Sequence, residues 1–369
     1  MSTPAEILHS KHEPAIAVKR RLLIVRLSSM GDVIHTLPAA SALRAALPEA
    51  TIGWIVEERW AELLCATAEP RSGPRSPRRP LVDKIHVVDT KTWRRKPWAV
   101  QTWERVAAFI SDLRAGRYDV AVDFQGAARS AFLARCSGAP TIYGFRQPRE
   151  NVASMFYTRQ TLAAGQHIIQ QNFSLAEAVL SKSLVPGRVQ LPCDDAAERK
   201  CEAWLQRESV HDFVLLNPGA GWGAKQWPAE CYGQVARLLA EDGLQSVINF
   251  GPGEEQLAEA VVASSQGSAR ASNSSVAELI SFTRRAKLFI GGDTGPMHLA
   301  AALHVPVVAL FGPTDPARNG PFGTRSVVLR HVFSRTSLSH QSAPDPGLQE
   351  ITLEEVVTAA RRLMRQRCG

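Results

Sequence analysis

The chain has 369 residues, of which 45% are hydrophobic and 21% are charged. This length is enough for two domains with cores of ordinary size, and the composition excludes an intrinsically disordered chain. The formal net charge of +8 favours anionic partners, namely nucleotide phosphates, nucleic acid or an anionic membrane surface, without choosing among them.

The cysteines are scattered and form no C-x-x-C pair. We therefore expect neither a disulfide framework nor a zinc site, and a reducing cytoplasm fits this usage better. Residues 1–21 contain acidic residues and no long apolar core, which is not the pattern of a signal peptide. No stretch reaches the roughly 18 apolar residues of a membrane span. The protein is expected to be soluble or to lie on a membrane surface.

Short β-branched runs alternate along the chain with amphipathic helical patterns. Strands are predicted at 22–27, 51–57, 84–89, 118–125, 213–218, 246–251, 286–292 and 305–312. The repeated order of strand, helix and strand is typical of parallel sheets covered by helices. The alternation stops between about 172 and 204, where the pattern turns helical and polar. Two doubly wound α/β halves are the simplest interpretation.

We place the boundary between these halves within 183–192 and divide the chain into 1–187, 188–345 and 346–369. The last part contains a helix that is expected to pack back onto the first half. The segment 69–80, EPRSGPRSPRRP, combines proline, arginine, serine and glycine, a composition that favours a mobile cationic loop over a packed element.

The strand at 22–27 is followed by Ser28-Ser29-Met30-Gly31-Asp32. Ligands of open α/β sheets bind at loops that leave the carboxyl ends of parallel strands. Gly31 lets the backbone turn or approach a ligand closely. Asp32 either caps the helix that follows or faces the crevice as a catalytic group.

The strand at 286–292 leads into Asp293-Thr294-Gly295-Pro296, and His298 lies in the first turn of the following helix. Proline suits a first helical position, and the free N–H groups of a helix N-terminus bind phosphate well. His298 could donate to an anion. The alternative is a capped helix with an ordinary histidine.

Two further stretches in the second half could contact a nucleotide. The glycine-rich loop within 215–228 contains Lys225, which could supply a point charge to a phosphate, although Gln226 rules out a P-loop of the G-x-x-x-x-G-K-[ST] type. Glu254 follows the strand at 246–251 and could hydrogen-bond sugar hydroxyls. The alternatives are a surface lysine and a helix-start glutamate favoured by the helix dipole.

The stretch KTWRRKPW, residues 91–98, mixes basic residues with tryptophan. It could meet phosphates at a membrane surface or bind single-stranded nucleic acid, or it is a solvated basic turn. Other signals are missing from the chain. There is no D-x-D to anchor a metal-bound nucleotide sugar, no H-E-x-x-H, and no G-x-G-x-x-G in the first loop.

Taken together, these stretches resemble the heptosyltransferases of lipopolysaccharide assembly, family nine of the inverting glycosyltransferases. The resemblance covers about residues 21–325, and several separate motifs occur in the right order. They are VRLSSMGDVIHTLPA, IVEERWAEL, YDVAVDFQGAARSA, PRENVASMFY, GGDTGPMHLAAAL and FGPTDP.

The resemblance implies a GT-B fold, in which two Rossmann-like halves face each other across a cleft. The first would bind the acceptor and the second the nucleotide sugar. The implied donor is ADP-L-glycero-D-manno-heptose, and the implied acceptor is a Kdo sugar of lipid A at the cytoplasmic face of the inner membrane. No metal or other cofactor is implied, and we expect a monomer that binds no nucleic acid.

The resemblance also assigns roles to residues. Asp32 matches the catalytic aspartate, which would take a proton from the attacking hydroxyl, with a pKa either raised by burial or low enough that the group mainly orients the hydroxyl. Donor-binding positions fall on Ala220, Gly221, Lys225, Glu254, Ser274, Asp293, Thr294, Gly295 and His298. Acceptor-binding positions fall on Lys91, Arg94, Arg95 and Arg149. The family has polar hydroxyls where this chain has Ala220 and Gly221, so only backbone N–H groups could serve there.

Three alternatives stay open. Another member of the same family could transfer a second heptose or use a different nucleotide sugar. A nucleotide-sugar epimerase on a similar two-domain scaffold would turn over the donor without an acceptor. A non-enzymatic protein that binds nucleic acid or membrane is suggested by the charge alone, but the ordered set of loop motifs disfavours it.

Overall fold

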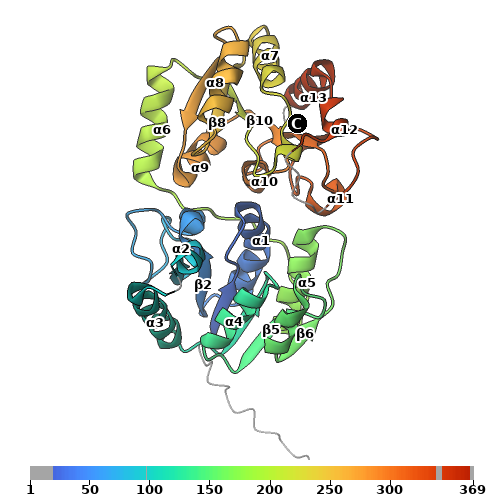
Figure 1. Cartoon of the computed structure of the whole chain (residues 1–369). Helices are drawn as coiled ribbons and strands as arrows, with labels where there is room; N and C mark the ends of the chain where they lie inside the picture. Colours follow the sequence, from blue (N-terminus) through green and yellow to red (C-terminus); the bar gives the residue numbers. More distant parts are fainter. Residues whose placement is uncertain (1–19, 97, 338–342, 366–369) are drawn as a thin grey trace, which may run out of the picture.

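The computed structural model describes residues 20–96, 98–337 and 343–365, and the side chain of Arg94 lies outside this description. The chain forms two α/β domains stacked one above the other (Figure 1). Each domain contains a six-stranded sheet whose neighbouring strands all run parallel, in the orders β3-β2-β1-β4-β5-β6 and β12-β11-β10-β7-β8-β9. The predicted architecture of two doubly wound α/β halves is confirmed.

The first domain is built from residues on the amino-terminal side of the chain. Its strands are β1 (Arg21–Val25), β2 (Thr51–Glu57), β3 (Lys84–Val88), β4 (Val120–Asp123), β5 (Thr141–Phe145) and β6 (Arg159–Thr161). Its helices are α1 (Met30–Ala46), α2 (Thr90–Arg95), α3 (Val100–Ala115), α4 (Ala128–Cys136) and α5 (Ile168–Leu180), with 3₁₀ segments η1 (Glu58–Leu63) and η2 (Asn151–Phe156).

The second domain repeats this plan. Its strands are β7 (Phe213–Asn217), β8 (Gln245–Phe250), β9 (Ala269–Asn273), β10 (Leu288–Gly292), β11 (Val307–Phe311) and β12 (Ser326–Arg330). Its helices are α6 (Asp195–Arg207), α7 (Ala229–Ala240), α8 (Glu255–Ser264), α9 (Val276–Arg285), α10 (Gly295–Ala302), α11 (Pro316–Asn319), α12 (Pro346–Gln349) and α13 (Leu353–Arg365), with the 3₁₀ segment η3 (Gly223–Lys225). Residues 181–194 join the two domains without a helix or strand.

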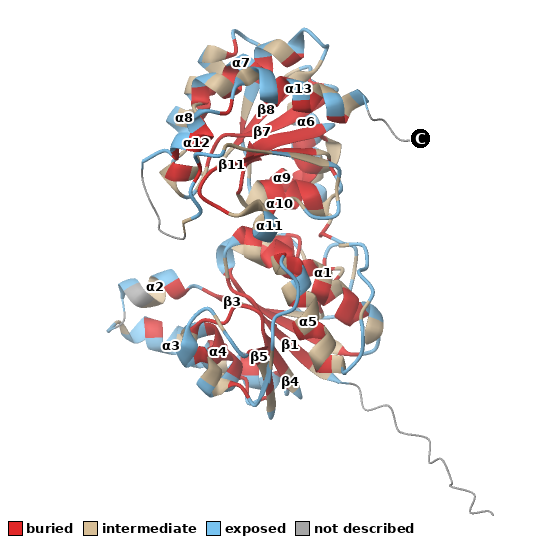
Figure 2. Ribbon diagram, turned by 90° about the vertical axis from the view of Figure 1, so that its right-hand side faces the viewer, coloured by how far each residue is buried: buried red, intermediate tan, exposed pale blue. Residues whose placement is uncertain are grey.

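Both sheets are covered by helices on both faces, so the strands form the buried centre of each domain (Figure 2). In β7, Leu215 packs into one apolar cluster with α9 and α10, whereas its neighbour Leu216 packs into another with α7 and α13. This alternation explains why the strands are continuous apolar runs, as expected for parallel strands buried on both faces. Every strand predicted from the sequence is present, and β5, β6, β9 and β12 were not predicted.

The C-terminal helix α13 packs on the second sheet. Val356, Ala360 and Leu363 recur at helical spacing and lie in the same apolar cluster as Leu288 and Val308 of that sheet. The expectation that this helix returns to the first domain is therefore wrong. The apolar stripe of α13 covers one face of the sheet of its own domain, and the helix also contacts the edge strand β12.

The arginine–proline segment 69–80 is mostly exposed, but one buried side chain anchors it. Its mobility stays a prediction. Arg79 is 1% exposed, and its guanidinium donates to the carbonyls of Pro70 and Pro74 while its Nε donates to Val82. A buried guanidinium can satisfy several backbone carbonyls that have no partner in a helix or strand. The segment also reaches the interdomain connection, because the carbonyl of Pro77 accepts the backbone N–H of Cys193 at 3.0 Å. Arg78 forms an ion pair with Asp195 at the start of α6.

Candidate active site

The carboxyl ends of the two sheets face each other, and the helices α1 and α10 meet there (Figure 1). The contact is close at two glycines. A Cβ on Gly31 would lie 2.7 Å from Cδ2 of His298, and a Cβ on Gly295 would lie 2.6 Å from Sδ of Met30. A larger residue at either position would overlap a side chain of the other domain, so glycine permits this close approach.

A cavity of about 440 Å³ lies beside this contact, a size typical of small-molecule sites. The first domain contributes the loop and first turn of α1 together with Trp60, and the second domain contributes the loops that follow its strands. Eight of the predicted donor-binding residues line the cavity: Ala220, Gly221, Lys225, Glu254, Ser274, Asp293, Thr294 and Gly295. His298 does not line it.

Lys225 and Asp293 form an ion pair on the wall of the cavity. Nζ of Lys225 lies 2.6 Å from Oδ2 of Asp293, and Nε2 of His298 lies 3.1 Å from Oδ1 of the same carboxylate. Burial by itself would raise the pKa of Asp293, but the hydrogen bond from His298 and the charge of Lys225 outweigh it and hold the pKa below its ordinary value. Asp293 is therefore ionised and holds both Lys225 and His298 in place.

The other ring nitrogen of His298 is also occupied, because Nδ1 lies 3.0 Å from Nε2 of His35 on α1. In this conformation His298 has no nitrogen left for a phosphate. Its predicted contact with the donor stays a prediction, and that contact would require one of these two bonds to break.

Glu254 and Ser274 lie where the loops after β8 and β9 reach the cavity. Oε2 of Glu254 accepts the backbone N–H of Gly251 at 2.9 Å, and its carboxylate packs directly against Gly219, where a Cβ would lie 2.2 Å from Oε1. The hydroxyl of Ser274 lies 3.2 Å from that of Ser272. A Cβ on Gly221 would meet no atom within 4 Å, so the cavity is open at this position.

Asp32 occupies the third position of α1 and closes a capping box with Ser29. The backbone N–H of Ser29 donates to Oδ2 at 2.9 Å, and Arg26 lies 2.5 Å from Oδ1. Burial would raise the pKa of Asp32, but Arg26 and the hydrogen bond from Ser29 outweigh it and hold the pKa below its ordinary value. The structure therefore shows the capping interaction, and of the two expected ways to tune this carboxylate it favours the low pKa.

Arg26 was not singled out from the sequence. It is buried, it donates to the carbonyl of Phe124 in addition to its ion pair with Asp32, and its Nε has no partner among the described residues. A buried arginine beside an aspartate six residues further along gives no sequence signal of its own, because the intervening turn brings the two together.

A second network fixes the loop that precedes Asp32. Oε1 of Gln125 accepts the backbone N–H of Leu27 at 2.8 Å, and the fully buried Asp123 holds the loop of Gln125 by accepting its backbone N–H at 2.9 Å. Tyr157 and Ser130 donate to the other carboxylate oxygen of Asp123. These residues belong to two of the motifs quoted above, so their part in supporting the site was visible only as family resemblance.

The predicted acceptor-binding residues lie at the carboxyl edge of the first sheet. Lys91 and Arg95 are exposed on α2, Arg149 is exposed on the loop after β5, and the side chain of Arg94 is outside the described residues. Arg129 on α4 lies between these groups and was not predicted. It donates to Ser28 at 3.3 Å and to Thr90 at 3.4 Å, and no carboxylate pairs with it among the described residues.

The arrangement can bind a diphosphate with protein groups alone. Lys225 and the N-terminus of α10, which begins at Gly295, present positive charge on one wall. The opposite side is lined by Ser29, Met30 and Gly31, whereas Asp32, the next residue of α1, does not itself line the cavity. Among the described residues no cluster of three or more His, Cys, Asp or Glu side chains is placed to hold a metal ion.

None of the described helices combines the length and the apolar composition needed to cross a bilayer.

Two Rossmann-like domains with a ligand cavity between the carboxyl ends of their sheets form the GT-B arrangement found in solved heptosyltransferases. The model of glycosyltransferase family 9 (heptosyltransferase) matches residues 106–345. The chain belongs to this family.

Relatives are similar in sequence to this chain over most of its length. Lipopolysaccharide heptosyltransferase 1 of Pseudomonas aeruginosa is 30% identical over 85% of this chain and 84% of its own length, and the Escherichia coli K12 protein of the same name is 31% identical over 84% and 93%. The solved structure "E. coli heptosyltransferase WaaC with ADP" is 27% identical, with a TM-score of 0.74 over 93% of this chain and 99% of the other.

Proposed function

We propose that this chain transfers L-glycero-D-manno-heptose from ADP-heptose to a Kdo sugar of lipid A, with inversion at the anomeric carbon. The observation that carries the proposal is the cavity between Lys225 and Gly295 on one wall and the first turn of α1 on the other. The similarity to an E. coli heptosyltransferase solved with ADP supports ADP as the leaving group. The relatives named lipopolysaccharide heptosyltransferase 1 support the first heptose as the one transferred.

The donor's diphosphate would lie against Lys225 and the backbone N–H groups at the start of α10. Lys225 is already inside the cavity and is held by Asp293, so little reorganisation is needed when the diphosphate arrives. Glu254 would accept hydrogen bonds from sugar or ribose hydroxyls, and Ser274 would lie beside the adenosine. Ala220 and Gly221 would offer backbone groups and open space.

Asp32 would accept the proton of the attacking Kdo hydroxyl. The hydroxyl oxygen attacks the anomeric carbon on the face opposite the diphosphate, the bond from that carbon to the diphosphate oxygen breaks, and ADP leaves with the electron pair. Because Arg26 keeps the carboxylate ionised, Asp32 mainly orients the hydroxyl and takes its proton only as the new bond forms. General-base help of this kind is worth about 10²–10⁴-fold in rate.

The first domain would bind the acceptor and the second the donor. Lys91, Arg94, Arg95 and Arg149 would meet the acidic groups of the acceptor, and Arg129 joins them because it lies between the loop of Ser28 and the start of α2. We infer a monomer on the cytoplasmic face of the inner membrane, with the exposed Trp98 and Trp103 near the lipid headgroups.

The test is incubation of the purified protein with ADP-heptose and Kdo-lipid A, with product masses recorded. The expected result is one heptose added to the acceptor, with release of ADP. The linkage, read by NMR, should show the anomeric configuration opposite to that of the donor. Absence of transfer, while an E. coli heptosyltransferase control is active under the same conditions, would overturn the proposal.

A second candidate is a later heptose transfer within the same family. The observation that favours it is 27% identity to lipopolysaccharide heptosyltransferase 3 of E. coli over 90% of this chain. Acceptors that already carry one or two heptoses separate the two candidates in the same mass assay. A nucleotide-sugar epimerase would instead convert the donor without an acceptor, and a donor-only incubation detects that reaction.

A further inference from the structure

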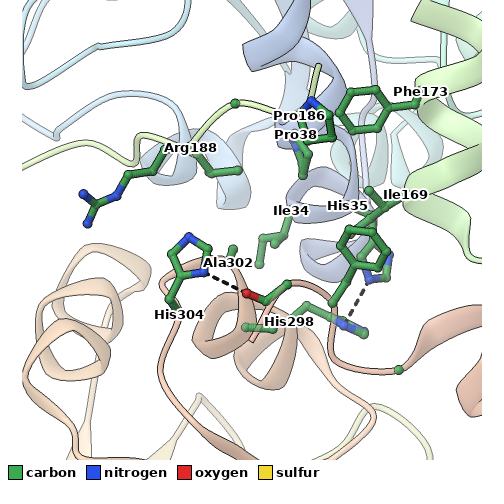
Figure 3. A pocket seen from close by; sticks show the side chains of 16 residues that line it. Ile34, His35, Pro38, Ile169, Phe173, Pro186, Arg188, His298, Ala302 and His304 are labelled. Carbon is green, nitrogen blue, oxygen red and sulfur yellow. Dashed lines mark hydrogen bonds between the residues drawn. The ribbon is translucent and has the colours of Figure 1, made fainter. Parts of the chain in front are cut away.

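The buried histidine His35 has no part in the chemistry proposed above. It is 5% exposed on α1, and its Nε2 lies 3.0 Å from Nδ1 of His298 on α10. Figure 3 shows the two rings meeting, one from each domain, beside a cavity of about 360 Å³. Residues 186–189 of the interdomain connection also line this hinge-side cavity. Because both rings are buried, the bond is shielded from water and orients them both.

The bond between His35 and His298 is followed by two further contacts. They lead to the donor wall, the side of the donor cavity that Lys225 and Gly295 line. His298 contacts Asp293 through Nε2 at 3.1 Å, and Asp293 contacts Lys225 at 2.6 Å. A neutral His298 that donates to Asp293 through Nε2 has a bare Nδ1, which accepts the N–H of His35. Three successive bonds therefore join α1 of the first domain to the lysine in the cavity.

The surroundings of His35 favour its neutral form. Burial lowers the pKa of this imidazole well below its ordinary value, and the neighbouring His298, His167 and Arg26 lower it further, whereas Asp293 acts in the opposite direction. A neutral imidazole has one N–H, which is the one that His298 needs.

The same helix carries the proposed catalytic carboxylate. His35 follows Asp32 by three residues, so the two side chains leave neighbouring positions on one side of α1. The backbone of this turn is fixed from behind, because Asn172 on α5 donates to the carbonyl of His35 at 2.9 Å. A bond that holds His35 against His298 therefore also sets the distance from Asp32 to the donor wall.

We propose that His35 is a positioning residue that acts through His298 and Asp293 to hold Lys225 at the working distance from Asp32. The role rests on the proposed function, because in that function Lys225 binds the diphosphate and Asp32 takes the proton. His35 itself touches neither substrate nor reacting atoms. Its effect is on how the two walls are aligned.

Two variants of His35 test the role. His35→Phe keeps a ring of similar size, with the hinge-side cavity as room to adjust, and removes the N–H. His35→Gln places an amide N–H close to where Nε2 lies. The control is His304→Phe, which alters another histidine of the same cavity whose bond, to the carbonyl of Gly323, stays within the second domain.

We expect His35→Phe to lower kcat by about 10- to 100-fold, the cost of a small misalignment, with ADP affinity unchanged. His35→Gln should recover most of this loss, and His304→Phe should match the wild type. A double variant of His35 and His298 should lose no more than the larger single variant. Wild-type kcat in a folded His35→Phe protein, no recovery by His35→Gln, or additive losses would each overturn the role.

A measurement that does not depend on catalysis tests the role of His35 separately from the proposed function. Hydrogen exchange at 294–298 should be faster in nucleotide-free His35→Phe than in the wild type, because the start of α10 loses its bond to the first domain. Unchanged exchange would overturn the link whatever the reaction. Failure of the proposed function would instead appear as a wild type that transfers no heptose.

Discussion

Asp32 and Asp293 lie in different domains, on either side of the contact between α1 and α10, and their surroundings differ. Each follows a buried parallel strand, lies at the start of a helix and has a pKa held below its ordinary value beside a cation. Asp293 is bound by two side chains, Lys225 and His298, and its side chain is 5% exposed. Asp32 is bound by one charged side chain, Arg26, and by its own turn, and its side chain is 32% exposed.

This difference indicates which aspartate reacts and which one holds the site together. A carboxylate whose oxygens are both taken by buried side-chain donors, as those of Asp293 are, has no room for a substrate proton. Asp32 keeps an accessible surface on α1, the helix whose first two residues line the cavity, although Asp32 itself is not among the lining residues. Two loops with similar sequence signals, GD and GDTG, thus lead to different roles, because partners from elsewhere in the fold decide how each carboxylate is used.

The largest expected effect is that of Asp32→Asn. Turnover should fall by about 10²–10⁴-fold, because the amide cannot take the proton of the attacking hydroxyl. ADP affinity, measured by calorimetry, should stay at the wild-type value. Asp315→Asn, which alters the cap of α11, is the matched control and should leave both quantities unchanged. Wild-type turnover in Asp32→Asn would remove the catalytic role.

Asp293→Asn should act on stability and ADP binding together. The change leaves Lys225 without its carboxylate, and we expect a loss of about 1–3 kcal/mol in the free energy of unfolding, moderated because the lysine is partly open to the cavity. Urea denaturation measures the first quantity, and calorimetry with ADP should show weaker binding. If only turnover fell while stability and ADP affinity were kept, the roles of the two aspartates would have to be exchanged.

Arg26→Met should change the pH dependence. In the wild type the pKa of Asp32 is lowered, so the base stays ionised, and kcat/KM should hold as pH falls to about 4, the ordinary range of a carboxyl group. Without Arg26, burial acts unopposed by that charge, and the acidic limb should move to higher pH by about 1–3 units. The pH profile of kcat/KM measures this shift. Superimposable profiles would mean that Asp32 is not the titrating base.

The smallest effect is expected for Arg129→Gln. Loss of one charged hydrogen-bond donor on the acceptor side should raise the acceptor KM by about 10-fold and leave ADP affinity unchanged. Arg135→Gln is the control, since Arg135 is exposed on the same helix, further from the loop of Ser28. Equal acceptor KM values for the two variants would place the acceptor elsewhere.

Much of the second domain's lining of the cavity could be expected from the sequence, because the loops of Lys225, Glu254 and Asp293 each follow an apolar strand. Ser274 is the exception, since it follows β9. The sequence could not predict that Lys225 pairs with Asp293 or that Arg26 pairs with Asp32. The first pair joins loops 68 residues apart along the chain, and the second depends on how the turn before α1 folds. His35 was not singled out from the sequence, and its partner His298 lies 263 residues further along the chain.

The errors have a physical cause as well. Composition predicted a loop at 69–80, but it could not predict that Arg79 is buried there and bonds to backbone carbonyls. The strand β9, with the sequence ARASN, has few β-branched residues and is formed by pairing with β8. The helix α13 has a clear apolar stripe, yet a stripe does not say which sheet it covers.

The most direct test of the account is a structure of the protein with ADP bound. The account predicts the diphosphate within hydrogen-bond distance of Lys225 and of the backbone at Gly295, with the Asp32 carboxylate on the opposite side of the space left for the sugar. ADP bound outside this cavity, or an Asp32 side chain separated from the diphosphate's free side by protein atoms, would contradict it.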